Sequence, residues 1–481
     1  MMITELMLIA SLFGVPSHPD DIQYQEYNFT PPLASEYRHE LSSGVPVYIV
    51  EDKELPLINL SLTFRGGSYL DPSNMIGVSS MMSSLLRSGG TTSMSAEELD
   101  EQFEFLAAIA GVNSSGETVN ASLNSLSSNF DESLHLFFDM LKNPGFQQSR
   151  IDLSKDGIIE QLKQRNDYPS SVLRRETASI LYGDSYKGRS TTQEMIAAVT
   201  VEDLRAIHKK IVNPSNLIIA VSGDFNKDEM LQTLDNIMAD WPFGETVKSP
   251  LEIDSNYDPG IYFVDQDVPQ GGVRIVLRSL RQGDPDLEAA TVMNYILGGG
   301  GFGSRITQTV RSNEGLAYSA GSFLMPGIYM DGLWGSGYES KSKTVMLAAS
   351  LVFNEISRIK EELVSENDLD FAKGALIEQF PSVFQSKAQT IGIFVSDEIS
   401  GRDPQYWSEY KNRISAVTAD DVMRVANELL TPADMAMVVV GNWGVISRGN
   451  DRASSKDILE VIGGSITELP LRDPLTLEPI N

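Results

Sequence analysis

The sequence predicts an α+β protein made of two homologous repeats, each a mixed or antiparallel sheet with helices packed on one face. Three observations predict this class. A block of residues recurs at a constant distance, so the second half of the chain repeats the first. Inside each half, strands alternate with helices without the regular rhythm of short βαβ units. The length of 481 residues is enough for roughly two to four domains, each able to bury a core.

The recurring block is clearest where a helix leads into a buried strand. Its members lie 218 positions apart: they are Val199, Thr200 and Asp203 in the first copy and Val417, Thr418 and Asp421 in the second. A threonine with an aspartate three residues later is typical of a capping box at the start of a helix. A proline and then an apolar strand follow in each copy, at residues 217–221 and 435–440. We therefore expect the same helix and strand in both repeats.

Another helix of the first repeat is predicted to begin after Ser95, which forms a capping-box pattern with Glu98. The apolar residues that share one face of this helix are Leu99, Phe103, Leu106 and Ala110. Gly111 is expected to end the helix. The apolar side chains are predicted to belong to the core.

These patterns divide the chain into five segments. They are a leader or disordered N-terminus at 1–24, a first repeat at 25–245, a linker at 246–258, a second repeat at 259–450 and a C-terminal tail at 451–481. The linker is placed where residues 240–260 are rich in Pro, Asp and Gly and lack periodicity.

The sequence leaves the compartment open. Residues 7–15 are an apolar run of signal-peptide length, but Glu5 precedes them and no Lys or Arg does. If residues 1–17 act as a signal peptide, the protein is periplasmic or secreted, and otherwise it is cytoplasmic. No window is long and apolar enough for a transmembrane span.

Composition argues against several classes of function. The 37 basic and 66 acidic residues give a net charge of −29 and a pI near 4.5. Such a field repels polyphosphate chains and anionic membrane surfaces, so nucleic acid is not an expected partner. The absence of cysteine excludes disulfides, thiolate metal ligands and a cysteine nucleophile.

The histidines do not form a metal-binding motif. They are His18, His39, His135 and His208, and no two are three to five residues apart. Without cysteine, a tetrahedral zinc site would need carboxylates for most of its ligands. We therefore expect no metal or other cofactor in this chain.

Three serines share one face of a helix predicted between Gly77 and Gly90. Ser80, Ser83 and Ser84 are spaced i, i+3 and i+4. A serine nucleophile needs a positioned base, and no S-x-x-K, G-x-S-x-G or neighbouring histidine supplies one at these positions. The hydroxyls are therefore expected to allow close packing or to face a polar cavity.

Residues 297–305, Leu-Gly-Gly-Gly-Gly-Phe-Gly-Ser-Arg, form the most distinctive stretch of the second repeat. Its glycines are Gly298, Gly299, Gly300, Gly301 and Gly303. A phosphate cradle would need a G-K-[ST] ending or the context of a dinucleotide site, and neither is present. The glycines also suit the close approach of another backbone.

Downstream of these glycines, Arg311 and Tyr318 offer a fixed cation and a phenol that can donate to peptide carbonyls. Such a pair would suit an extended peptide. The simpler alternative is that Arg311 is a surface ion-pair residue and Tyr318 a half-buried aromatic of a strand.

From about residue 30 to residue 450, the chain resembles the pitrilysin/insulinase family of zinc peptidases, the inverzincins. The motifs that carry the resemblance are Gly66-Gly67-Ser68 before the serine helix, the repeated Val-Thr-x-x-Asp blocks, and residues 297–305 followed by Arg311 and Tyr318. The resemblance implies the LuxS/insulinase-like metallopeptidase fold.

In active members of that family, the helix carries H-x-x-E-H, with two zinc ligands and a glutamate that activates water. Here those positions hold Ser80, Ser83 and Ser84, and the distal ligand falls at Glu160 or Gln161. Neutral hydroxyls are poor zinc ligands and cannot act as a general base at neutral pH. The resemblance therefore implies a degenerate zinc motif and no complete catalytic set in this chain.

The resemblance also implies a role for Arg311 and Tyr318, which match a substrate-contacting Arg and Tyr seven residues apart in the family. A chain with this pair and without the zinc ligands is similar to the substrate-binding, non-catalytic subunit of heterodimeric zinc metallopeptidases. The implied partner is a catalytic insulinase-family subunit that carries H-x-x-E-H and the zinc. The implied substrate is a peptide, and the acidic charge favours basic or neutral peptides.

Two alternatives remain open at the level of sequence. A non-enzymatic peptide-binding or assembly scaffold predicts a stable complex without peptidase activity. An independent enzyme with another chemistry predicts peptide turnover by the metal-free chain alone. A neighbouring reading frame of similar length with H-x-x-E-H would favour the heterodimer.

Overall fold

The computed structural model describes residues 29–252 and 257–480. Residues Pro32–Asn481 form one compact unit, separate from Met1–Pro31. The predicted leader at 1–24 lies outside the described residues. Everything below concerns the compact unit.

The first half of the unit is built on a six-stranded mixed sheet with the order β1-β2-β6-β3-β5-β4. Its strands are β1 (Arg38–Glu40), β2 (Pro46–Glu51), β3 (Leu57–Arg65), β4 (Ile109–Ser114), β5 (Thr118–Leu126) and β6 (Leu217–Gly223). Only the β2–β6 pairing is parallel among the described pairs of this sheet. The strand predicted at 217–221 is therefore confirmed as β6.

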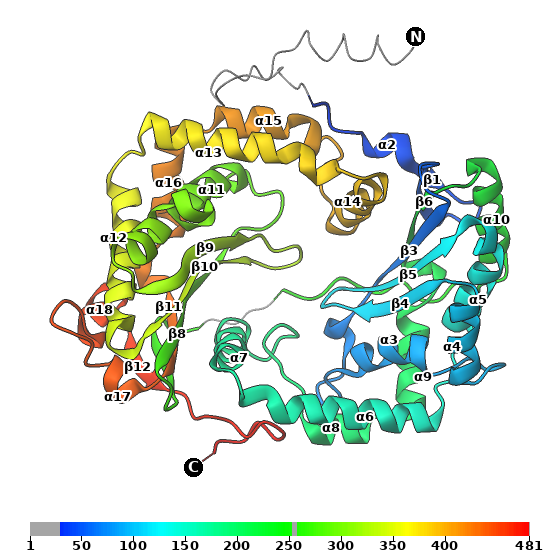
Figure 1. Cartoon of the computed structure of the whole chain (residues 1–481), viewed down its shortest axis with the longest axis horizontal. Coiled ribbons are helices and arrows are strands. Elements are labelled where there is room, and N and C mark those ends of the chain that lie inside the picture. The colour runs from blue at the N-terminus through cyan, green and yellow to red at the C-terminus, as the bar shows by residue number, and fades with distance from the viewer. Residues whose placement is uncertain (1–28, 253–256, 481) are drawn as a thin grey trace, which may run out of the picture. The chain divides into compact units, whose positions relative to one another are not determined.

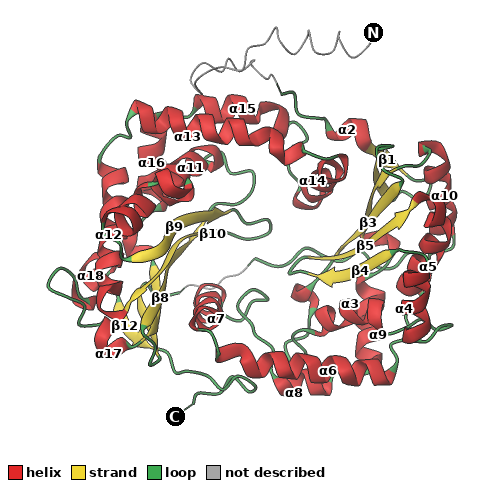
Figure 2. Ribbon diagram, viewed as in Figure 1, coloured by secondary structure: helices red, strands yellow, loops and turns green. Residues whose placement is uncertain are grey.

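The second half repeats this sheet with the order β12-β7-β11-β8-β10-β9. Its strands are β7 (Gly260–Asp265), β8 (Gln270–Ser279), β9 (Ala317–Met325), β10 (Gly332–Lys341), β11 (Ala436–Gly441) and β12 (Ser465–Glu468). In both sheets, five strands taken in chain order are arranged as first, fifth, second, fourth and third. The shared order supports the duplication predicted from the recurring block. Figure 2 draws the two sheets in yellow.

Helices of the same half cover one face of each sheet (Figure 1). In the first half the helices are α2 (Ala34–Tyr37), α3 (Val78–Ser88), α4 (Ala96–Phe105), α5 (Phe130–Lys142), α6 (Gln148–Lys163), α7 (Pro169–Tyr182), α8 (Gln193–Ala198), α9 (Val201–Ile211) and α10 (Lys227–Ala239). In the second half they are α11 (Leu287–Asn294), α12 (Val345–Glu361), α13 (Glu366–Gln379), α14 (Lys387–Ser400), α15 (Tyr406–Ala416), α16 (Ala419–Leu429), α17 (Trp443–Ile446) and α18 (Ser455–Ile462). Among the described residues, none of the helices combines the length and the apolar composition that a membrane span requires.

The capping boxes that marked the repeat are present at equivalent helices. At the start of α9, the amide of Asp203 donates to Thr200 Oγ1 at 3.2 Å, and the amide of Thr200 donates to Asp203 Oδ2 at 2.9 Å. Thr418 and Asp421 make the same two bonds at the start of α16, at 3.1 and 3.0 Å. Each box satisfies amides that the first turn of a helix otherwise leaves without partners.

The helix predicted from Ser95 to Gly111 is wrong at its C-terminal end. Helix α4 ends at Phe105, and Ala107 has a positive φ of 51°, which turns the chain out of the helix. Ala110 and Gly111 belong instead to strand β4, which pairs with β5. Leu99 and Phe103 are buried in the core, as predicted. The apolar residues keep helical spacing as far as Ala110, but the pairing with β5 makes residues 109–114 a strand. A helical pattern does not reveal that pairing.

The second face of each sheet is also covered, and the covering helix comes from the other half of the chain. Val172 and Leu173 of α7 pack against Val264, Val438 and Val440 of the second sheet. In the reciprocal contact, the residues of α14 are Ile391, Phe394 and Val395, and those of the first sheet are Tyr48, Ile218 and Ala220. Figure 1 shows both helices beside the sheets that they cover. The two helices have equal length and start 218 positions apart, the same shift that separates α9 from α16.

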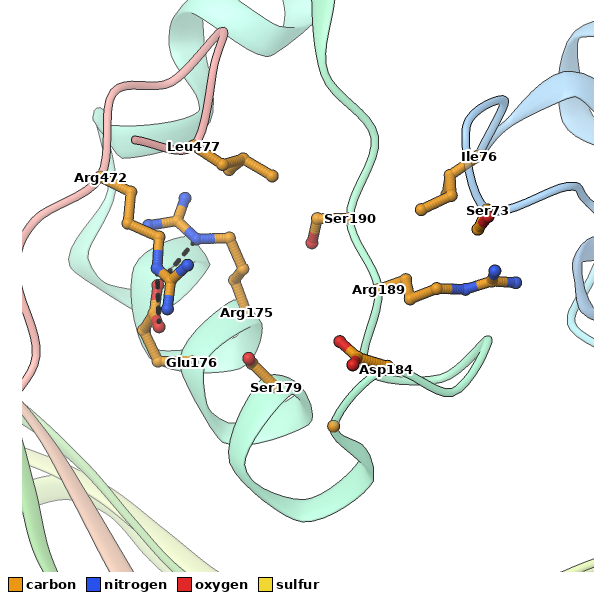
Figure 3. A pocket seen from close by; sticks show the side chains of 12 residues that line it. Ser73, Ile76, Arg175, Glu176, Ser179, Asp184, Arg189, Ser190, Arg472 and Leu477 are labelled. Atoms are coloured by element: carbon orange, nitrogen blue, oxygen red, sulfur yellow. Dashed lines mark hydrogen bonds and ion pairs between the residues drawn. The ribbon is translucent and has the colours of Figure 1, made fainter. Parts of the chain in front are cut away.

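Two segments connect the halves. Residues 246–258, predicted as a linker, contain no helix or strand among the residues that are described. Residues 451–481, predicted as a tail, contribute α18 and β12 to the second half. Beyond β12 the chain returns to α7, where the buried Glu176 carboxylate accepts a hydrogen bond from Arg175 Nε at 2.9 Å and pairs with Arg472 Nε at 3.6 Å. These groups line a cavity of about 410 Å³ (Figure 3).

Candidate functional site

Arg311 and Tyr318 lie together on the second half. Arg311 belongs to a π-helical segment, Thr307–Asn313, and Tyr318 is the second residue of β9. Between them Gly315 has a φ of 62°, and this left-handed turn reverses the chain into the strand. The Arg311 guanidinium therefore lies over the Tyr318 ring, 5.1 Å from its centroid. Tyr318 is 87% exposed, so its hydroxyl is free to meet a ligand.

Phe302, to which the sequence analysis assigns no role, completes this cluster. Its ring centroid is 4.3 Å from the Arg311 guanidinium carbon, so the cation lies over two aromatic rings. Phe302 is 69% exposed, so its ring does not belong to the hydrophobic core. The sequence feature that could have indicated Phe302 is its position as the one aromatic residue within the run of glycines at 298–303. We call Phe302, Arg311 and Tyr318 the clamp cluster.

The glycines of the loop serve mainly to bring backbone segments together. A side chain at Gly298 would collide with the backbone of Ser322 in β9, and one at Gly299 with Asn294. Gly301 has a φ of 65° and begins the short turn that presents Phe302. Gly300 lies against Tyr295, and Gly303 is exposed beside Phe371. The backbone that approaches Gly298 is thus a strand of the same chain.

The three serines are not presented to one shared space. Ser80 and Ser84 are exposed on α3, whereas Ser83 is 1% exposed and its hydroxyl donates to the Ser79 carbonyl at 2.9 Å. An i to i−4 bond of this kind satisfies a hydroxyl inside the helix itself. The predicted packing role therefore describes Ser83, while the other two face outward.

The residues at the predicted zinc positions do not fit a zinc ion. Ser80, Ser83 and Ser84 supply neutral hydroxyls, and Glu160 pairs with Lys163 at 2.5 Å on the exposed side of α6. Gln161 is exposed and carries no charge. Within residues 29–252 and 257–480, no group of three or more His, Asp or Glu side chains is placed to hold a metal.

The described histidines have structural surroundings. His208 Nε2 contacts the Leu141 carbonyl at 2.8 Å, and its ring packs edge-on against Phe146 at 6.1 Å. Because a carbonyl only accepts, Nε2 carries the proton. Burial lowers the pKa of His208, and this effect is larger than the rise caused by the hydrogen bond to Leu141. His39 also has a lowered pKa from burial, while His135 is exposed on α5.

A cavity of about 640 Å³ lies next to the clamp cluster. Tyr318 forms part of its wall, together with strands β8 and β10 and the first turn of α7. This arrangement gives the exposed phenol a neighbouring space that a peptide side chain could enter.

Comparison with known proteins agrees with this architecture. Residues 47–194 match the family model described as insulinase (peptidase family M16), and residues 198–376 match the model described as peptidase M16 inactive domain. The two models together span more than half of the chain.

Individual relatives cover most of the chain at low identity. The non-peptidase homolog YmxG of Helicobacter pylori is 26% identical over 70% of this chain and 78% of its own length. The probable mitochondrial-processing peptidase subunit beta of Arabidopsis thaliana is 22% identical over 88% of this chain and 83% of its own. The crystal structure of a peptidase M16 inactive domain from Pseudomonas fluorescens superposes with a TM-score of 0.77 at 24% identity, over 84% of this chain and 97% of that one.

The predicted fold class is thereby confirmed, with two mixed sheets and their helices arranged as in the insulinase-like fold. The chain belongs to the insulinase family, peptidase family M16.

Proposed function

We propose that this chain is a non-catalytic, peptide-binding subunit that works with a second insulinase-family subunit carrying H-x-x-E-H. One observation carries the proposal: the clamp cluster is assembled with both of its rings exposed, whereas the positions of the zinc motif hold hydroxyls that do not fit zinc. Binding groups without hydrolytic groups suit a subunit that holds substrate for another chain.

The chemistry of the clamp cluster suits a peptide backbone. The Arg311 guanidinium has five N–H donors in a fixed plane, and the Tyr318 hydroxyl can donate as well. The two rings next to Arg311 restrict its motion and leave its edges available for carbonyl oxygens. In a complex, these donors would stabilise negative charge that develops on the peptide oxygen during hydrolysis.

The names of two relatives support this division of labour. The Helicobacter pylori relative is named a non-peptidase homolog, and the Arabidopsis thaliana relative is named a subunit of a processing peptidase. The first name also suits a peptide-binding or assembly scaffold, which is the second candidate function.

The proposal is tested by replacing Arg311 and Tyr318 together, as Arg311→Ala with Tyr318→Phe. We expect the double variant to lose at least about tenfold in affinity for a fluorescein-labelled peptide, because two hydrogen-bond donors are removed. The same variant should slow peptide hydrolysis by the complex reconstituted with a homologue that carries H-x-x-E-H.

The matched control is Ser80→Ala with Ser84→Ala, since both hydroxyls are exposed and the pair is outside the clamp cluster. This control should bind and support hydrolysis like the unmodified chain. Full binding and full activity in the Arg311 and Tyr318 double variant would overturn the proposal. Peptide binding without hydrolysis in any reconstitution would favour the scaffold.

A further inference from the structure

The cavity beside Tyr318 contains a cation without a counter-charge. Arg274 of β8 lies on its floor and is half-buried. Among the residues that the structure describes, Arg274 has no hydrogen-bond acceptor and no ion-pair partner. Charged side chains that are withdrawn from water are normally paired, so this guanidinium invites an anion.

Other positively charged side chains near Arg274 make the cavity more favourable for an anion. Burial lowers the pKa of Arg274, and the positive charge of Arg174, on the exposed side of α7, lowers it further. Lys341 also lines the cavity. Glu339 is the one acidic residue among the described lining residues, and it is exposed and forms no ion pair with Arg274.

The floor next to Arg274 leaves room for a ligand. Arg274 lies opposite Gly337 of β10, which lies opposite Gly321 of β9. Residues directly opposite in antiparallel strands point to the same face of a sheet. On this face, Gly337 therefore places no side chain beside Arg274, whereas the space next to Gly321 is filled by the Gly298 carbonyl. The cavity of about 640 Å³ is lined by Arg274, Gly337 and Tyr318.

We propose that this cavity binds a carboxylate of the peptide held by the clamp cluster, with Arg274 as its partner. The inference rests on the proposed function and adds a substrate preference to it. A guanidinium can hold both oxygens of a carboxylate through parallel N–H bonds. Two sources share this chemistry, the side chain of Asp or Glu and the C-terminus of a peptide.

The test compares labelled peptides of alanine, serine and tyrosine that differ in one feature. One has a central Glu and an amidated C-terminus, the second has Gln in place of Glu, and the third has Gln with a free C-terminal carboxylate. We expect one of the two carboxylate peptides to bind about fivefold to tenfold more tightly than the amidated Gln peptide. Which peptide gains identifies the source of the carboxylate.

Variants assign the preference to Arg274. Arg274→Gln should abolish it, and Arg274→Lys should keep part of it, because lysine retains the charge without the paired N–H groups. The matched control is Arg205→Gln, which removes one exposed arginine from α9 and should leave the preference intact.

Failure of this inference can be separated from failure of the proposed function. If all three peptides bind equally, and binding is lost in the Arg311 and Tyr318 double variant, only the carboxylate cavity is overturned. A preference that survives in Arg274→Gln overturns the assignment as well. If the unmodified chain binds none of the peptides, both the proposed function and the cavity are overturned.

Discussion

In the clamp cluster, the Arg311 guanidinium lies over the rings of Phe302 and Tyr318, which reach it from the glycine loop and from strand β9. The spacing of Arg311 and Tyr318 along the sequence marked them as a pair, and the turn at Gly315 brings them together. The position of Phe302 depends on how the glycine loop folds back along β9, which involves contacts distant in sequence. A pattern of nearby residues does not contain that information.

Replacing Phe302 tests whether the ring beside Arg311 matters. Phe302→Ala removes one of two cation–π contacts, each contributing about 0.5–1 kcal/mol at an exposed site. We expect peptide affinity to fall about twofold to fivefold, measured by fluorescence anisotropy. Phe105→Ala removes another exposed phenylalanine, from the end of α4, and serves as the control. Equal affinities of the two variants would show that the Phe302 ring contributes nothing to binding.

His208 makes the fold sensitive to acid. Burial lowers its folded pKa below the ordinary value, so the unfolded chain binds the proton more readily. The stability of the fold with a neutral His208 is therefore complete above about pH 6.5, and it falls as the pH drops below that value and the unfolded chain takes up the proton. His208→Gln should therefore reduce the loss of stability between about pH 7 and about pH 5, measured by urea unfolding. An unchanged pH dependence in this variant, with His135→Gln as the control, would contradict the role of His208.

At the scale of elements, local signals predicted where helices begin better than what they contact. The capping boxes at Thr200 and Thr418 defined the starts of α9 and α16 because the bonds form within four residues. The sequence analysis did not predict that α7 packs on the sheet of the second half and α14 on the sheet of the first. An apolar helix face indicates burial, but it does not indicate which sheet supplies the opposite surface.

The contact between α7 and the C-terminal segment predicts that the charge of Glu176 contributes to the stability of the fold. The Glu176 carboxylate is buried and faces Arg175 and Arg472, so Glu176→Gln would leave two guanidiniums without their counter-charge (Figure 3). We expect a loss of about 3 kcal/mol in the free energy of unfolding, measured as a lower urea midpoint. The same substitution at Glu160, an exposed residue paired with Lys163, should cost less than about 1 kcal/mol. Similar midpoints for the two variants would contradict this account of the contact.

At the scale of the whole molecule, the repeat was readable from sequence, and its consequence for the sheets is now visible. A constant shift of 218 positions predicts equivalent elements, and both sheets have the same strand order. The repeat does not predict which half carries which side chains. The serines of α3 lie in the first half, and the arginine of the clamp cluster lies in the second.

The net charge of −29 and the cation of the cavity act over different distances. The overall field should speed the association of basic peptides in dilute salt, whereas Arg274 acts only at contact. Raising the ionic strength from about 0.01 M to about 1 M shortens the Debye length from about 30 Å to about 3 Å. We expect the association rate of a lysine-containing peptide to fall strongly in stopped-flow measurements, and that of a neutral peptide to change little. Equal salt dependence for the two peptides would contradict long-range steering.

The central claim is that this chain binds peptides for a catalytic partner and does not hydrolyse them itself. The most direct measurement is zinc content together with hydrolysis of a fluorogenic peptide, for the chain alone and after mixing with a homologue that carries H-x-x-E-H. We predict no stoichiometric zinc and no hydrolysis for the chain alone, and hydrolysis after mixing that depends on Arg311 and Tyr318. Stoichiometric zinc with hydrolysis by the chain alone would contradict the account.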